Sequence, residues 1–414
     1  MTYDAIIVGA RCAGSPTAML LARKGYRVLL LDRASFPSDT LSTHFIHQPG
    51  VARLKRWGLL EQVIASNCPP IPTLSLDVGY LTLEGTKSLM EEAPDAYSPR
   101  RRVLDQILVD AAVAAGAELR EGFQAQELLW DDGRVAGIRG QTRDGAAVTE
   151  RARIVIGADG MRSFVARSVR APAYKTRPTL ACMYYSYWSD VSLNRAGIWL
   201  RPGLIAAAWP TNDDLTLVLL EWPRREFDRV RADVEGNFER TVEKLPGLVD
   251  RLRAGRRVEW ICGTADLPNF FRRPYGPGWA LVGDAGYHRD PATGQGITDA
   301  LRDAELLAEA LDAGFAGRQR MEAALAGYER QRNRAAVWMY RLTTWVATRQ
   351  FPPGGRPLLE ALHGNQQETD RLFGTLIGTV SIPEFFSPLN LLRLIGKHYL
   401  SKSKICPASL AGNK

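Results

Sequence analysis

Three short apolar segments, far apart in the chain, each run into a glycine-containing turn. Residues 3–8 lead into the turn 9–14 (GARCAG), 154–156 into 157–160 (GADG), and 279–282 into 283–285 (GDA). Apolar residues at helical spacing follow the first turn up to residue 24, and another apolar stretch follows at 27–31. This order is a βαβ unit. Turns that follow parallel strands lie at one edge of a sheet, so the three turns are expected to converge.

The turn at residues 9–14 has features of a dinucleotide-binding loop. Gly9 allows the tight turn and Gly14 allows close packing of helix on strand, so backbone amides can hold a pyrophosphate. Asp32 closes the following strand, where an acid bonds ribose hydroxyls. Arg11 replaces the central glycine of GxGxxG, which limits backbone approach to the phosphates but adds a guanidinium contact. The neighbouring residues Ala13 and Arg33 are expected contacts as well.

The turn at residues 283–285 extends into a second glycine-containing loop. Gly283 and Asp284 end the strand, and a helical pattern begins near residue 297. A carboxylate at a strand end accepts hydrogen bonds from a ribityl chain, and a helix N-terminus suits an anionic reduced flavin. The loop before that helix adds backbone amides near the ring system at Pro291, Gly294 and Gly296.

With Asp159-Gly160 between them, these motifs resemble the fingerprints of class A (single-component) FAD-dependent monooxygenases, the aromatic-hydroxylase family. That family is related to geranylgeranyl-reductase-like and flavin halogenase flavoproteins. The resemblance covers residues 3–330. It implies that Asp159 serves both FAD and NADPH and that Arg101 contacts FAD, with Arg100 or Arg102 as alternatives. A family histidine after Gly-Asp-Ala-Ala is shifted here to His288, whose role stays open.

The resemblance implies an FAD-dependent monooxygenase. Such an enzyme uses O2 and transiently bound NADPH or NADH to hydroxylate or epoxidise a small, electron-rich organic substrate. The alternatives are a reductase of the geranylgeranyl-reductase type, a flavin halogenase, and an FAD-binding partner protein without turnover. No WxWxIP stretch occurs in the sequence, and residues 197–200 (GIWL) do not supply it, which disfavours the halogenase.

Candidate substrate and catalytic residues come from two regions. His44 follows the second strand, where it is either a flavin contact and proton carrier or a packed histidine. From about residue 170 to 265 the helical pattern lapses and aromatic, β-branched stretches predict an antiparallel sheet. Of its aromatics, Tyr185, Tyr187 and Trp209 are candidates for an apolar substrate pocket, with a place in the core as the alternative.

The predicted fold class is α/β, with a Rossmann-like FAD-binding domain interleaved with an antiparallel-sheet substrate domain and a C-terminal helical region. The predicted boundaries are 1–75, 98–170 and 275–334 for the FAD domain, 76–97 and 171–274 for the sheet domain, and 335–414 for the helices. A Pro/Gly loop is expected at 351–357. The helical region has three open roles: capping the substrate cavity, forming a dimer surface, or touching a membrane.

Composition narrows the remaining classes. The net charge of +8 is spread along the chain, which is not a nucleic-acid signature. Because the chain has no leader and no apolar run of roughly 20 residues, we expect a cytoplasmic protein without a membrane span. The five cysteines form no CxxC pair, so neither a disulfide framework nor a metal site is expected; they are Cys12, Cys68, Cys182, Cys262 and Cys406. Monomer and homodimer are both open.

Overall fold

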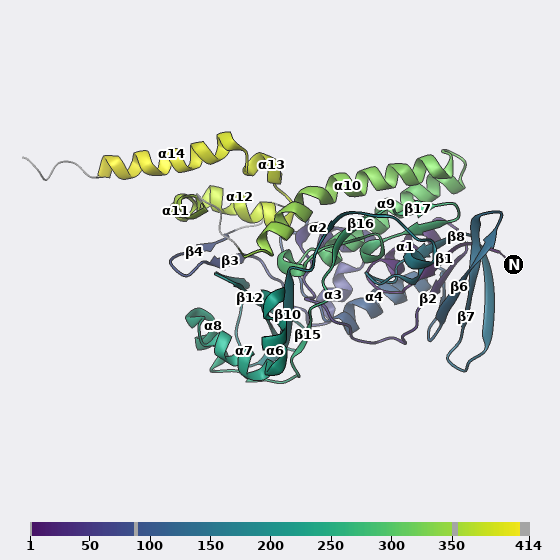
Figure 1. Cartoon of the computed structure of the whole chain (residues 1–414), viewed down its shortest axis with the longest axis horizontal. Helices are drawn as coiled ribbons and strands as arrows, with labels where there is room; N and C mark the ends of the chain where they lie inside the picture. Colours follow the sequence, from purple (N-terminus) through teal and green to yellow (C-terminus); the bar gives the residue numbers. More distant parts are fainter. Residues whose placement is uncertain (1, 87–89, 350–354, 406–414) are drawn as a thin grey trace, which may run out of the picture.

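The computed structural model describes residues 2–86, 90–349 and 355–405 (Figure 1). A Rossmann-like sheet with strand order β17-β18-β8-β1-β2-β5 forms one half of the molecule, and the β6–β7 hairpin extends it from β8. The strands β18, β8, β1, β2 and β5 run parallel. The bounds are β1 (Thr2–Val8), β2 (Val28–Leu31), β5 (Glu118–Arg120), β6 (Gln124–Asp131), β7 (Arg134–Gln141), β8 (Ala147–Gly157), β17 (Tyr275–Gly276) and β18 (Trp279–Leu281).

Helices cover this sheet because its central strands are apolar on both faces. In β1, Ala5, Ile6 and Ile7 are all fully buried. One layer of helices has α1 packed against both α4 and α9, and α9 packed against α10. The helices of this half are α1 (Gly14–Ala22), α2 (Gln48–Trp57), α3 (Leu60–Ala65), α4 (Arg101–Ala114), α5 (Phe164–Ser168), α9 (Gly296–Phe315) and α10 (Met321–Val346).

The second sheet has the order β14-β10-β13-β12-β11-β3-β4, with β15 also paired to β10. The prediction of an antiparallel sheet is confirmed for β10, β13, β12 and β11, whereas β3 joins β11 in parallel. The bounds are β3 (Leu74–Asp77), β4 (Thr82–Glu84), β10 (Ala181–Ser189), β11 (Ala196–Arg201), β12 (Leu204–Pro210), β13 (Thr216–Pro223), β14 (Arg256–Arg257) and β15 (Cys262–Thr264).

The prediction that the helical pattern lapses between residues 170 and 265 is wrong. Three helices lie there: α6 (Phe227–Ala232), α7 (Val234–Val242) and α8 (Pro246–Leu252), after the short turn η1 (Arg224–Glu226). Their apolar residues Phe238, Leu248 and Leu252 share a core with Tyr184 and Trp188 of β10. A buried sheet face needs an apolar cover, and these helices provide it.

A third, small sheet has the order β19-β16-β9 and connects the two halves. Its strands are β9 (Ala173–Arg177), β16 (Asn269–Arg272) and β19 (Tyr287–His288). The turns η2 (Gly283–Ala285) and η3 (Pro291–Thr293) flank β19. Because β19 lies between η2 and η3, the small sheet holds the two loops that precede α9 in place.

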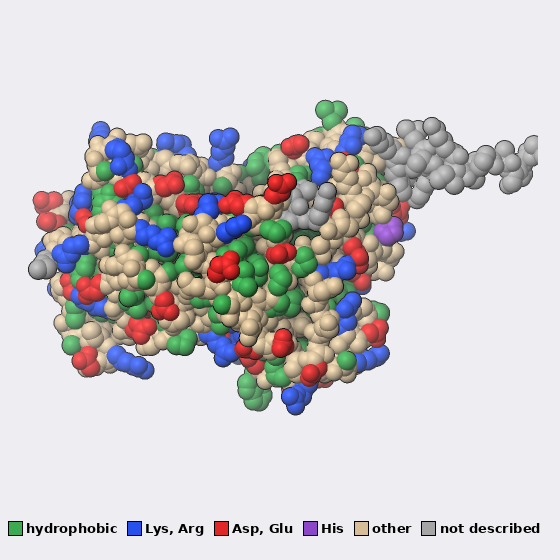
Figure 2. Space-filling view, turned by 180° about the vertical axis from the view of Figure 1, so that it is seen from behind, with side chains coloured by type: hydrophobic (Ala, Val, Ile, Leu, Met, Phe, Trp, Pro, Cys, Tyr) green, Lys and Arg blue, Asp and Glu red, His purple; other side chains and the backbone are tan. Residues whose placement is uncertain are grey.

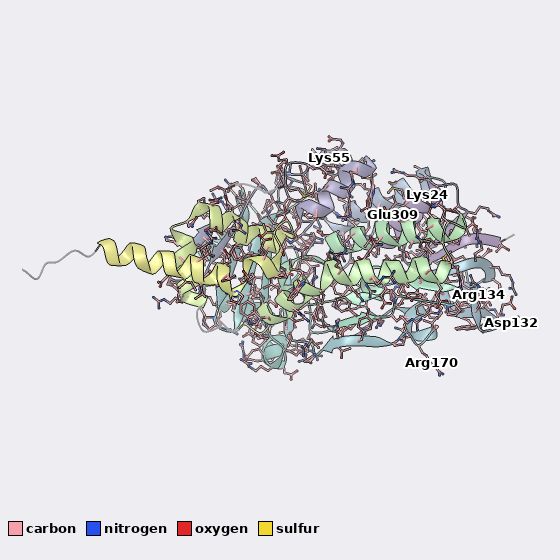
Figure 3. All side chains as sticks on the ribbon, turned by 90° about the horizontal axis from the view of Figure 1, so that it is seen from above. Lys24, Lys55, Asp132, Arg134, Arg170 and Glu309 are labelled. Carbon is pink, nitrogen blue, oxygen red and sulfur yellow. The ribbon has the colours of Figure 1, made fainter. Side chains whose placement is uncertain are left out.

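The predicted C-terminal helical region is present as α11 (Gly355–His363), α12 (Gln366–Ile377), α13 (Ile382–Phe385) and α14 (Pro388–Ile405). Buried Leu362, Phe373 and Phe385 share a core with Met183 of β10, so these helices cover the other face of the second sheet. Within the described residues, no helix has the length and apolar character needed to cross a membrane. The α14 helix and the β6–β7 turn at Asp132 lie at opposite ends of the long axis (Figure 3).

Some predictions fall outside the described residues or stay untested. Residues 351–354 of the expected Pro/Gly loop and Cys406 lie outside them, while Cys12, Cys68, Cys182 and Cys262 are free thiols. The predicted domain boundaries stay a prediction. On the face shown in Figure 2, basic and acidic side chains are interspersed, as expected from charges spread along the chain.

Candidate active site

The three glycine-containing turns border a single cavity of about 1200 Å³. The turns follow β1, β8 and β18, which are neighbours in the sheet. The cavity therefore lies at the carboxyl edge of the parallel strands, where open α/β sheets bind ligands. Twelve of the thirteen predicted cofactor residues line it: Gly9, Arg11, Ala13, Asp32, Arg33, Arg101, Asp159, Gly283, Asp284, Pro291, Gly294 and Gly296.

Gly14, the remaining predicted cofactor residue, lies beneath the first turn. A Cβ atom on Gly14 would lie 1.7 Å from the Gly9 carbonyl oxygen, and Gly9 itself has φ +104°. Only glycine fits at both positions. Asp32 holds the same turn by accepting hydrogen bonds from the amides of Ala10 at 2.7 Å and Ala34 at 2.8 Å. Because each carboxylate oxygen has a further lone pair, Asp32 can also bind ribose hydroxyls.

Two arginines that line the cavity, Arg11 and Arg101, are both bound to the carboxylate of Asp105. Asp105 is fully buried, and its oxygens accept hydrogen bonds from Arg11 at 2.6 Å and from Arg101 at 3.1 Å. Arg11 also donates to the Ser38 hydroxyl at 3.0 Å. This arrangement places two guanidinium groups at the cavity wall, where they suit an anionic ligand.

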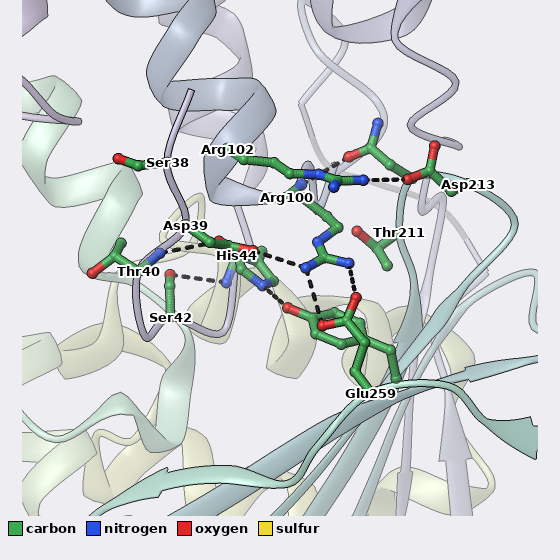
Figure 4. Close-up of polar contacts among 12 residues, drawn as sticks. Ser38, Asp39, Thr40, Ser42, His44, Arg100, Arg102, Thr211, Asp213 and Glu259 are labelled. Carbon is green, nitrogen blue, oxygen red and sulfur yellow. Dashed lines mark hydrogen bonds and ion pairs between the residues drawn. The ribbon is translucent and has the colours of Figure 1, made fainter. Parts of the chain in front are cut away.

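The other two arginines of the RRR segment point elsewhere (Figure 4). Arg100 pairs with Glu259 and, at 2.8 Å, with Asp39, while Arg102 donates to Asp213 at 2.9 Å. Neither is among the residues that line the cavity. Of the three candidates, Arg101 is the one whose position allows contact with a ligand in the groove.

Asp159 lies at the second turn. One carboxylate oxygen accepts hydrogen bonds from the amides of Phe164 at 2.6 Å and Val165 at 3.3 Å. The other oxygen is buried and has no partner among the described residues. Burial raises the pKa of Asp159 above its usual range. An unpaired buried acceptor at the cavity wall is suited to a hydroxyl or amide of a ligand.

The third turn and the α9 N-terminus close the far end of the groove. Gly283 and Gly294 adopt left-handed φ values of +60° and +62°, and Asp284 is exposed to the cavity. Asp299, in the first turn of α9, pairs with Arg289 at 2.7 Å and with Arg302 at 2.5 Å. These ion pairs fix the helix end that faces the cavity.

None of the predicted catalytic and substrate residues is among those that line the cavity. They are buried behind its wall, which agrees with the alternative of a place in the core. The His44 Nε2 atom is hydrogen-bonded to the Tyr187 hydroxyl (Figure 4), and burial lowers the pKa of His44 to about 3. Tyr185 accepts a hydrogen bond from the Ser42 amide at 3.3 Å, and Trp209 packs against Phe45 with centroids 5.1 Å apart. These contacts of Tyr185, Tyr187 and Trp209 are thus all with the 42–45 segment.

The wall also contains residues outside the predicted set of site residues: Ser42, Thr43, Phe45, Arg162, Arg167, Met183, Leu267, Asp290 and Asp303. Met183 lies on the same face of β10 as Tyr185, so strand alternation could have found it. Asp290 directly precedes Pro291 of the predicted loop.

The donor set fits FAD. Glycines leave backbone room beside the phosphates, Arg11 and Arg101 supply positive charge, and carboxylates at Asp32 and Asp284 suit the ribose and ribityl hydroxyls. The N-termini of α1 and α9 both face the cavity, which favours anionic groups at two places.

Residues 2–343 match the family model described as FAD binding domain. The chain belongs to this family and is an FAD-dependent oxidoreductase. Digeranylgeranylglycerophospholipid reductase 1 of Methanopyrus kandleri is 30% identical over 317 residues, which cover 73% of this chain and 78% of that protein.

Solved structures share the fold. The myxobacterial chondrochloren halogenase has a TM-score of 0.78 at 20% identity, covering 96% of this chain and 97% of that one. A probable FAD-dependent monooxygenase from Pseudomonas aeruginosa has a TM-score of 0.68 at 21% identity, covering 90% and 100% of the two chains. At these identities the likeness concerns the fold alone, since one flavoprotein fold serves several reactions.

Proposed function

We propose that this protein is an FAD-dependent reductase that saturates carbon–carbon double bonds of an isoprenoid chain. The observation that carries the proposal is the 30% identity, across 73% of the chain, to a digeranylgeranylglycerophospholipid reductase. The sequence motifs first favoured a monooxygenase. The similar halogenase and monooxygenase structures are too distant in sequence to support either reaction here, so the reductase, an alternative at the outset, becomes the preferred function.

The cavity wall suits an apolar chain. Beyond the polar groove, Leu41, Phe45, Met183 and Leu267 line the cavity. Phe45, Met183 and Leu267 belong to the core between the second sheet and the C-terminal helices. Burial of an isoprenoid chain against these side chains gains roughly 0.8 kcal/mol per CH₂ group. An apolar wall with few polar groups selects for a hydrocarbon without fixing its length.

In the proposed enzyme, the residues already described hold the cofactor. Gly9, Arg11 and Asp32 hold the adenosine diphosphate end, with Ala13, Gly14 and Arg33 beside them. Arg101, Asp159, Gly283 and Asp284 hold the central part, and Pro291, Gly294 and Gly296 border the ring. Bound FAD, once reduced by NADPH or NADH, supplies the hydride for the reduction.

The protein's own contribution is positioning and exclusion of water. The 42–45 segment forms the wall beside the groove, and Tyr185, Tyr187 and Trp209 brace it from behind. His44 stays neutral at physiological pH because burial keeps its pKa at about 3. We therefore assign His44 to bracing the wall through its hydrogen bond with the Tyr187 hydroxyl.

The test is anaerobic turnover of the purified holoenzyme with NADPH or NADH and geranylgeraniol as the probe. The expected product gains two hydrogen atoms for each saturated double bond, detected by mass spectrometry. A parallel aerobic reaction with phenolic and indolic compounds measures oxygen uptake. Oxygen-dependent gain of one oxygen atom by such a compound, with no hydrogen gain by the prenyl probe, would restore the monooxygenase and overturn the proposal.

A further inference from the structure

A buried cluster of two carboxyl groups and one guanidinium group reaches the cavity wall, and none of its three members is among the cofactor residues assigned above. Asp290 precedes η3, Glu221 lies in β13, and Arg349 follows α10. Their exposed fractions are 1%, 0% and 6%. Arg349 donates through Nη2 to Glu221 Oε1 and through Nε to the Glu221 carbonyl oxygen at 3.3 Å. Residues distant in sequence thus converge on one buried site.

Two oxygen atoms of this cluster lack a partner. Asp290 Oδ1 accepts the Ala292 amide at 3.1 Å, but Asp290 Oδ2 and Glu221 Oε2 are buried with no hydrogen-bond donor among the described residues. Leaving two such acceptors unsatisfied is costly. One proton placed on either carboxyl group converts it into a donor toward the other group. Two carboxyl groups that share one proton are a known arrangement at active sites.

The charges of the cluster also favour one proton bound between the two carboxyl groups. One guanidinium group faces two carboxyl groups, and a buried unpaired charge is strongly disfavoured. Burial raises the pKa of Glu221 well above its usual range, with the Asp290 carboxyl raising it further. Burial also raises the pKa of Asp290, although Arg349, the hydrogen bond with Glu221 and His288 oppose the shift. The pair is therefore suited to sharing one proton.

Three other titratable groups lie around the cluster: His288, Arg289 and Cys182. His288 of β19 acts on Asp290, and its Nδ1 atom is bound to the Pro268 carbonyl oxygen. Arg289 is paired with Asp299 at 2.7 Å. On the β10 side, burial raises the pKa of the Cys182 thiol to about 11, so the thiol is neutral.

Only Asp290 of the three lines the cavity, immediately before the Pro291 loop that we assign to the flavin ring. We propose that Asp290 is the proton donor of the reduction, with Glu221 and Arg349 as positioning residues. This inference rests on the proposed function. Saturation of a double bond adds a hydride to one carbon and a proton to the other. The hydride comes from the reduced cofactor, and the proton comes from the Asp290 carboxyl group.

In that step the Asp290 O–H bond breaks, its electron pair stays on the carboxylate, and a C–H bond forms on the substrate. The cluster then holds two carboxylates beside one guanidinium, which favours uptake of a proton from solvent and restores the starting state. Between turnovers Asp290 and Glu221 share the proton through the hydrogen bond between their carboxyl groups. Arg349 holds Glu221 in place.

The experiment compares wild-type holoenzyme with Asp290→Asn and Glu221→Gln. Asparagine retains an acceptor for the Ala292 amide, and glutamine retains one for Arg349, so both variants preserve the local contacts. Glu368→Gln in α12 is the matched control, because Glu368 is also buried and arginine-paired, with Arg371 at 3.0 Å, but is not among the residues that line the cavity.

The first measurement is infrared spectroscopy at neutral pH. Wild type and Glu368→Gln are expected to show the carbonyl band of a protonated carboxylic acid that shifts in D₂O. That band is expected to disappear in Asp290→Asn and in Glu221→Gln. A spectrum in which neither variant removes a protonated-carboxyl band overturns the shared proton.

The second measurement is anaerobic reoxidation of the prereduced holoenzyme by geranylgeraniol. Asp290→Asn is expected to bind FAD and accept electrons from NADPH normally, but to slow reoxidation about 100-fold or more, as loss of a general acid does. Equal reoxidation rates in wild type and Asp290→Asn overturn the donor role alone. Absence of prenyl reduction in wild type overturns the proposed function and the donor role together.

If Asp290→Asn loses its cofactor, the Glu221→Gln variant tests the donor role of Asp290 instead. Its neutral amide leaves Arg349 to ionise Asp290, so the same loss of the infrared band and the same slow reoxidation are expected. A wild-type solvent isotope effect on reoxidation that vanishes in Glu221→Gln supports the donor role, and an unchanged effect contradicts it.

Discussion

Asp105 is the residue on which both arginines of the groove depend. Replacing it by asparagine leaves Arg101, only 9% exposed, without a counter-charge. Breaking a buried ion pair from one side costs about 3–5 kcal/mol. We expect Asp105→Asn to destabilise the FAD-free protein by this amount and the FAD-loaded protein by less, because the pyrophosphate replaces the lost charge.

Urea unfolding of both forms tests the Asp105 prediction. Asp110→Asn in the same helix, where the side chain is exposed and bound by Gln106, is the control and should leave both values unchanged. An equal loss of stability with and without FAD would show that Asp105 does not act through the phosphate end.

Asp284 and Arg11 should differ in importance for flavin retention. Asp284 faces the cavity directly, whereas Arg11 is tied to Asp105 and Ser38, and its side chain is 25% exposed. We expect Asp284→Ala to be purified colourless and Arg11→Ala to remain yellow with weaker FAD binding. The flavin absorbance per mole of protein measures both. Equal or greater loss in Arg11→Ala contradicts this ranking.

Two buried histidines make stability depend on pH. Burial lowers the pKa of His44 to about 3 and that of His47 to about 4. Between about pH 4 and the unfolded value near 6.5, the unfolded chain binds protons that the folded protein does not. Stability therefore falls as the pH falls through this window, by up to about 1.4 kcal/mol per pH unit for each histidine.

The free energy of unfolding measured from pH 7.5 to 4.5 tests this. His47→Gln should flatten the slope, and exposed His363→Gln should not. A wild-type slope indistinguishable from that of His47→Gln would show that His47 is protonated in the folded protein.

At the scale of elements, the distance between α1 and β1 depends on Gly14. A Cβ atom there would lie 1.7 Å from the Gly9 carbonyl oxygen and 3.1 Å from the Ala158 Cβ atom, so Gly14→Ala must push α1 away from the turn. We expect FAD affinity to fall about tenfold or more, because the amides at the α1 N-terminus leave the phosphate position.

Fluorescence titration of the FAD-free protein measures the effect of Gly14→Ala. Gly364→Ala, at a position with no atom within 4 Å of the added Cβ, is the control. Unchanged affinity in Gly14→Ala would mean that the turn relaxes without moving the helix.

Local sequence patterns predicted best the helices and strands whose pattern does not depend on packing against distant segments. Residues 5–8 of β1 are all apolar, and the helical pattern of α9 begins at Gly296. The helices α6 to α8 escaped prediction because their apolar residues are sparse and serve the second sheet. Their helical state depends on that sheet, which lies elsewhere in the sequence.

At the scale of the whole molecule, FAD should stabilise the folded state alone. The groove is built from residues 9–14, 157–160 and 283–296, which are far apart in an unfolded chain. Ligand at 100 times its dissociation constant adds about 2.7 kcal/mol. We expect the melting temperature to rise with FAD concentration, and to rise less with ADP, which fills only one end. A melting temperature independent of FAD would contradict a groove that spans all three segments.

The sequence by itself determined the strand–turn–helix units and the glycines and acids at their ends, because strict steric and electrostatic requirements act within a few residues. Tertiary structure alone decided which side chains face the cavity. Tyr187 and His44 lie behind the wall, while Asp290 meets Glu221 and Arg349. The direction of a side chain depends on what packs against it, and those partners come from segments that no local pattern connects.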